Sequence, residues 1–146
     1  WYSDHCPSSG DDVWWATASK WFVAPEVVAE KFVPASGGGF AQSLDSSYPL
    51  VVEGGLIALE LMPEYTPTEK RWQRASCQLL AGGETKAERK KNSDNVLRRG
   101  GLWLTGKNVG LKDANDANSA QKHALWYLVH TVKHRPTIER YFTTEE

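Results

Sequence analysis

"NSAQKHALWYLVHTVKHRP", residues 118–136, carries the clearest helical pattern of this 146-residue chain. Its apolar side chains recur at helical spacing, and Asn118 or Ser119 can accept the free amides of a first turn. Pro136 cannot continue a helix, because its ring removes the amide hydrogen and collides with the preceding turn. We therefore predict a helix over residues 119–134, and the rest of the fold is built outward from it.

This predicted helix has two unlike stripes when residues are placed at helical intervals. One stripe, within an arc of about 60°, consists of His123, Tyr127, His130 and His134. The opposite stripe consists of Leu125, Leu128, Val129 and Val132. An amphipathic helix turns its apolar side to the core, so we expect the histidine stripe to face solvent.

Two of these histidines lie one turn apart and could share a metal ion. Zinc takes three or four ligands, so His130 and His134 would need partners from elsewhere in the chain. The candidates are His5 and Cys6 near the start and Asp113 and Asp116 before the helix. One alternative is therefore a metal-dependent hydrolase with zinc as its cofactor, although a solvated polar face explains the same pattern.

The remaining segments predict an α+β fold in a single domain over 1–146, a length that can bury a core without staples. Helices are expected over residues 8–22 and 25–32, where acidic residues and Pro25 suit first turns. Gly54 and Gly55 between two apolar runs favour a β-hairpin over 48–62. Alternation and flanking glycines predict the further strands 71–80 and 102–105. Together they give an antiparallel sheet with helices on one face.

Charge is distributed unevenly along the chain. Residues 1–83 hold five Lys or Arg against ten Asp or Glu, whereas residues 84–135 hold eleven against five. The segment 84–99 reads as a helix that Gly100 ends, or as a mobile loop, because its apolar residues form no usable stripe. Such a segment would be solvated and would leave its cations free to meet a partner.

The basic segment 86–107 is the strongest functional signal. Its cations could contact phosphates, and an aromatic ring beside them could stack on bases. The candidate residues are Lys86, Arg89, Lys90, Lys91, Arg98, Arg99, Trp103 and Lys107. The leading hypothesis is a small soluble binding module for nucleic acid or another polyanion.

Tryptophan and cysteine usage adds a further alternative and a further expectation. Seven Trp could act as contact anchors, which would make the chain a protein–protein interaction domain. Cys6 and Cys77 permit one disulfide, and we predict that they are either bridged or both buried and inert. No run of apolar residues approaches the length of a membrane span, so no membrane partner is expected. The cellular compartment is left open.

Overall fold

The computed structural model describes residues 26–33 and 44–142. The backbone contacts divide the chain into two compact units, with the division between Trp72 and Gln73. Each unit is described by itself below. This division does not test the prediction of one domain over 1–146, which stays a prediction. The predicted helix over 8–22 lies outside the described residues.

The first unit is built around a helix where a hairpin was expected. Helix α2 spans Leu44–Ala58, so the predicted β-hairpin over 48–62 is wrong. Val52, Leu56 and Leu59 follow one another at spacings of four and three residues, which is the helical period. They pack in one apolar cluster with Leu61, Met62 and Trp72. The two glycines lie inside the helix, where the packing of this face outweighs their poor helix propensity.

Residues 26–33 are extended, so the second predicted N-terminal helix, over 25–32, is also wrong. Strand β1, Ala29–Glu30, pairs in parallel with strand β2, Trp72–Gln73. The amide of Ala29 donates to the carbonyl of Arg71 at 3.0 Å. The carboxylate of Glu53, in α2, accepts from the backbone amide of Phe32 and from the ammonium of Lys31. These bonds tie the extended segment to α2.

The sheet itself is smaller than expected and of the opposite kind. It has two strands of two residues each, so the predicted antiparallel sheet is wrong and the described chain is mostly helical. The predicted strand 71–80 keeps only Trp72–Gln73 and continues as the 3₁₀ helix η2, Ala75–Gln78. Within it the amide of Cys77 donates to the carbonyl of Arg74 at 2.9 Å. Local bonds of this kind replace the bonds to a neighbouring strand.

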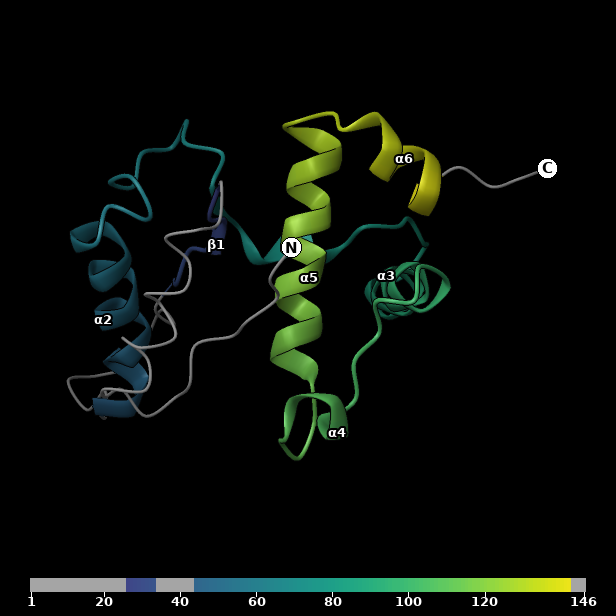
Figure 1. The fold of residues 1–146 in the computed structure, drawn as a ribbon, viewed down its shortest axis with the longest axis horizontal. Helices are drawn as coiled ribbons and strands as arrows, with labels where there is room; N and C mark the ends of the chain where they lie inside the picture. The colour runs from purple at the N-terminus through teal and green to yellow at the C-terminus, as the bar shows by residue number, and fades with distance from the viewer. Residues whose placement is uncertain (1–25, 34–43, 143–146) are drawn as a thin grey trace. The chain divides into compact units, whose positions relative to one another are not determined.

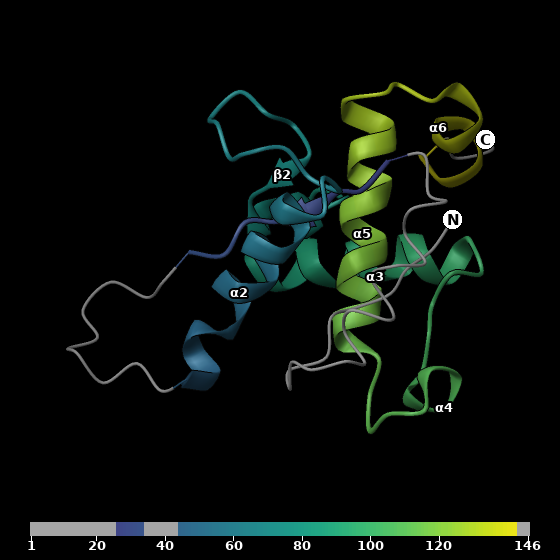
Figure 2. The ribbon, with the colours of Figure 1, turned by 60° about the vertical axis from the view of Figure 1, so that its left-hand side comes forward.

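The second unit is helical. Its helices are α3 (Lys86–Arg99), α4 (Gly106–Val109), α5 (Asn115–His130) and α6 (Arg135–Phe142). Figures 1 and 2 show α4 beside the N-terminal end of α5 and α6 beside its C-terminal end. Helix α5 contacts η2, α3 and α6. The core of this unit contains Val96 and Leu97 of α3 and Leu125 of α5, all almost fully buried.

Helix α5 corresponds to the predicted helix 119–134 but ends four residues earlier, at His130. Lys133 takes a positive φ of 54°, a conformation that interrupts a helix. A separate helix, α6, then begins at Arg135. Pro136 stands in its first turn, where a missing amide hydrogen is harmless. The proline therefore opens a helix here and does not end one.

The expected polar stripe of α5 is only half exposed. His123 and Tyr127 are buried, whereas His130 is exposed. The side-chain amide of Gln73 donates to the carbonyl of His123 at 3.1 Å, and its oxygen bonds Nδ1 of the imidazole. In the opposite stripe Leu125 is buried as expected, but Val132 is 47% exposed. Helix α5 contacts η2, and Gln73, shortly before η2, binds His123 on the face that was assigned to solvent.

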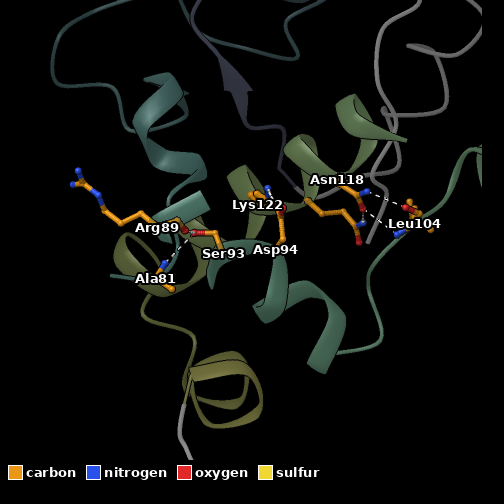
Figure 3. Close-up of polar contacts among 8 residues, drawn as sticks. Ala81, Arg89, Ser93, Asp94, Leu104, Asn118 and Lys122 are labelled. Carbon is orange, nitrogen blue, oxygen red and sulfur yellow. Dashed lines mark hydrogen bonds and ion pairs between the residues drawn. The ribbon is translucent and has the colours of Figure 1, made fainter. Parts of the chain in front are cut away.

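The predicted strand 102–105 is extended but belongs to no sheet. The side chain of Asn118 takes the place of a neighbouring strand (Figure 3). Its Oδ1 accepts from the amide of Leu104 at 3.0 Å, and its Nδ2 donates to the carbonyl of Leu104 at 2.9 Å. The Nε2 of Gln121 donates to the carbonyl of Leu102 at 2.7 Å. Two amides of α5 thus satisfy the backbone of this segment.

Candidate polyanion-binding surface

Helix α3, which carries six of the eight candidate residues, has well-defined ends. The hydroxyl of Thr85 accepts from the amide of Glu88 at 3.1 Å, and the carboxylate of Glu88 accepts from the amide of Thr85 at 3.1 Å. This reciprocal pair is a capping box, and it satisfies amides that the first turn would otherwise leave open. Gly100 follows the last turn. The segment is therefore a capped helix.

The expectation that this helix has no buried stripe is wrong. Ser93, Val96 and Leu97 are almost fully buried, and Gly100 follows on the same side. The hydroxyl of Ser93 donates to the carbonyl of Arg89 at 2.7 Å and accepts from the amide of Ala81 at 3.2 Å (Figure 3). The buried stripe contains only two large apolar side chains, Val96 and Leu97, and its other members are Ser93 and Gly100. A sequence pattern based on large apolar residues alone does not detect such a stripe.

The cations of α3 are all exposed, including Lys86 and Arg89, which the helical period places on the side of the buried stripe but in the first turns of the helix. The six exposed Lys and Arg residues of this helix are Lys86, Arg89, Lys90, Lys91, Arg98 and Arg99. Among the residues that the structure describes, none of the six forms an ion pair. The helix fixes these positive charges along one element, and each of them is open to solvent.

Both acidic residues of α3 have partners in the described chain. The carboxylate of Glu88 binds the amides of Glu84 and Thr85, at the helix end where a negative charge is stabilised. Asp94 forms an ion pair with Lys122 of α5, shown in Figure 3. Lys122 is only 5% exposed, so its ammonium is committed to Asp94. The negative charge of Asp94 is therefore neutralised by Lys122 of α5. It does not reduce the positive charge of the exposed cations on the same helix.

Trp103 lies against one of these cations. The guanidinium carbon of Arg98 stands 3.8 Å from the centre of the Trp103 ring. Trp103 is half-buried and packs on the core cluster of Val96, Leu97 and Leu125. The structure thus brings together two predicted site residues. Lys107 is exposed in α4, and in the described part of the chain no hydrogen bond or ion pair joins it to α3.

Sequence reasoning missed Lys122 and Asp94 as a pair. Lys122 follows Asn118 by four residues and precedes Leu125 by three, so the helical period places it with residues that face the rest of the unit. A lysine on such a face needs a counter-charge, because burial of an unpaired ammonium is costly. That signal was present in the sequence. The identity of the partner, 28 residues away, was not.

The two candidate metal ligands lie on different elements. His130 ends α5, and its ring centre is 4.7 Å from that of Trp126. His134 precedes α6, and its Nδ1 lies 2.8 Å from the hydroxyl of Thr137. Over residues 26–33 and 44–142, no group of three or more His, Cys, Asp or Glu is arranged to hold a metal ion. His5 and Cys6, two of the proposed further ligands, lie outside those residues. The metal alternative remains untested.

The described residues bear on only part of the cysteine and tryptophan expectations. Cys77 is half-buried, and its pairing with Cys6 stays a prediction because Cys6 lies outside the described residues. Of the described tryptophans, Trp72 is buried and Trp103 and Trp126 are half-buried. These three rings pack largely within their units. In the described part of the chain no tryptophan is exposed, so none of these three supports the alternative of a protein–protein interaction domain.

Comparison with known protein families, with characterised proteins and with solved structures gives no match to this chain. A functional assignment must therefore come from its own residues. None of the helices in the described ranges is long and apolar enough to cross a membrane. The exposed cations of α3 and the Arg98–Trp103 contact are the features on which such an assignment can rest.

Proposed function

We propose that this chain is a binding module that contacts nucleic acid through the phosphate-binding surface, defined here as the exposed cations of α3 together with Trp103. The observation that carries the proposal is the uncompensated charge of α3. Its six exposed cations have no ion-pair partner among the described residues. Of its two carboxylates, Asp94 is paired with Lys122 of α5, and Glu88 binds backbone amides at the start of the helix. Phosphates are the common biological anions that such a row of Lys and Arg attracts.

The length of the helix sets the scale of the contact. Fourteen residues at about 1.5 Å each give α3 a length of roughly 20 Å. Nucleotides follow one another by about 3.4 Å along a strand, so the surface would span roughly six of them. The cations point in several directions around the helix, so we expect about four of the six to contact phosphates at once. Binding by such contacts releases counterions and must weaken as salt rises.

The test is a titration of a labelled single-stranded oligonucleotide at several salt concentrations. With about four phosphates neutralised, the slope of log affinity against log salt should be near −3. Between 50 and 200 mM salt the affinity should then fall by roughly 50-fold. A slope near zero, or no binding at the lowest salt, would remove the proposal.

A matched pair of variants locates the contact. The double variant Lys90→Glu/Lys91→Glu should make the slope shallower by about 1.4, the contribution of two phosphates to a single strand. The control Lys70→Glu/Arg74→Glu changes two exposed cations outside α3 and gives the same net charge. It should leave the slope close to that of the wild type. Equal effects of the two double variants would mean that overall charge, and not α3, governs binding.

A further inference from the structure

The C-terminal end of α3 holds an arginine that is supported on one side and open on the other. The guanidinium of Arg98 stands 3.8 Å over the ring of Trp103, a distance of direct contact. Trp103 is in turn fixed against the core cluster, while Arg98 is exposed. An arginine in this arrangement loses little freedom when a ligand binds, because its plane is already oriented by the ring beneath it.

A second cation–aromatic pair lies next to the first. A Cβ atom at Gly100 would come within 2.0 Å of the Tyr141 ring, so this ring packs directly on the backbone that follows α3. The guanidinium of Arg140 stands 5.4 Å from the centre of the same ring. Gly100 lies between Arg98 and Trp103 in the chain. Helix α6 therefore brings another cation and another half-buried ring to the end of α3.

Flat cationic and aromatic groups recognise a different part of a nucleic acid from the lysines of α3. Lysine contacts phosphate as a point charge, whereas a guanidinium plane can stack on the face of a base. Base faces are covered by their neighbours in a duplex and become accessible in single strands, loops and ends. Proteins that bind single strands combine such stacking groups with a cationic track for the backbone. Both parts are present in this unit.

We infer that the phosphate-binding surface is selective for single-stranded nucleic acid, with one unpaired base stacked on the open face of Arg98 while Lys90 and Lys91 contact the backbone. This inference rests on the proposed function and specifies its ligand. Arg140 and Tyr141 extend the surface for the next nucleotide. The Arg98–Trp103 pair sets the preference for an unpaired base, and the lysines supply affinity without regard to sequence.

The direct test compares three probes with the wild-type chain at one low salt concentration: a single-stranded 12-mer, the matching duplex, and a 12-mer with the same phosphates but abasic positions in its centre. We expect the intact single strand to bind about tenfold more tightly than the abasic strand, because stacking of a base on such a group is worth about that much. The duplex should also bind more weakly. Equal affinity for the intact and abasic strands would overturn the inference.

Two conservative variants assign the effect to one residue. Arg98→Lys keeps the charge and removes the plane, so it should lower affinity for the intact strand about tenfold and leave the salt slope unchanged. Arg74→Lys is the control, because Arg74 is exposed, lies outside α3 and has no ring contact among the described residues. It should stay within about twofold of the wild type. Equal losses in the two variants would contradict stacking on Arg98.

The two proposals fail in different ways. Steep salt dependence with equal binding of the intact, abasic and duplex probes would leave the proposed function standing and remove the single-strand inference. Absence of binding to all three probes at low salt would remove both. Far-UV circular dichroism of each variant checks that α3 is retained, and the three-probe comparison needs no variant at all.

Discussion

Replacing Asn118 with alanine removes the amide that pairs with both backbone groups of Leu104. Asn118 is 3% exposed, and its two bonds to Leu104 measure 2.9 and 3.0 Å. Each such bond contributes about 1 kcal/mol net, and a buried group left unpaired adds a desolvation penalty of about 1–3 kcal/mol. Leu104 is half-buried, so water can reach part of its backbone and the lower end applies. We expect a loss of about 2–3 kcal/mol in the free energy of unfolding.

Thermal unfolding followed by far-UV circular dichroism measures this loss. For a chain of this length, 1 kcal/mol corresponds to about 2–4 °C, so the Tm should fall by roughly 5–10 °C. The control Asn115→Ala changes an exposed residue of the same helix and should shift the Tm by no more than about 2 °C. Equal shifts in the two variants would refute the claim that Asn118 replaces a strand. Loss of the two bonds to Leu104 should also make the neighbouring Trp103 more mobile, and so weaken its contact with Arg98.

Three further substitutions test the packing that supports the surface. Leu97→Ala should lower the free energy of unfolding by about 3 kcal/mol, since Leu97 is fully buried; a loss below 1 kcal/mol in urea unfolding would mean that α3 is solvated. Gly100→Ala should lower it by about 1–3 kcal/mol through the clash with the Tyr141 ring, whereas Gly82→Ala, with open space around it, should change it by less than about 0.5 kcal/mol. Asp94→Asn should cost about 3 kcal/mol by leaving the buried Lys122 ammonium uncompensated, and Asp94→Asn/Lys122→Met should recover most of it; no recovery would contradict the pairing.

Local signals in the sequence located helices α3 and α5 better than the sheet, whereas α4 and α6 were not predicted. The capping pair Thr85 and Glu88 and the terminal Gly100 define α3, and all three are visible in the sequence. Leu125 is buried in α5, as its place in the helical period requires. These features depend on residues within one or two turns of each other. That is why a single sequence carries them.

The strand predictions were wrong because strand formation depends on residues far apart in the sequence. An apolar run interrupted by Gly54 and Gly55 fits a hairpin and a buried helix equally well until its packing partners are known. The segment 102–105 looks like a strand and is extended, but its hydrogen bonds go to Asn118 and Gln121. Whether an extended segment joins a sheet depends on what lies beside it. That information is distributed over the chain.

Buried polar residues account for the errors around the candidate site. His123 was assigned to solvent because histidine is polar. It is buried instead, because Gln73, 50 residues away in the chain, binds it. Lys122 is buried for the same kind of reason, with Asp94 as its partner. The candidate cations were identified correctly as exposed, because no long-range partner is needed to keep a lysine or arginine in water. Sequence reasoning was therefore most accurate for residues that do not depend on distant contacts.

The central claim is that nucleic acid binds to the phosphate-binding surface of α3. It is tested most directly by hydrogen–deuterium exchange of the whole chain with and without a single-stranded oligonucleotide at low salt. We expect slower exchange in the presence of the oligonucleotide over residues 86–103 and in α6, and unchanged exchange in α2. The protection should disappear at 500 mM salt, because the phosphate contacts are then screened. Protection confined to α2, or none anywhere while the oligonucleotide is bound, would contradict the account.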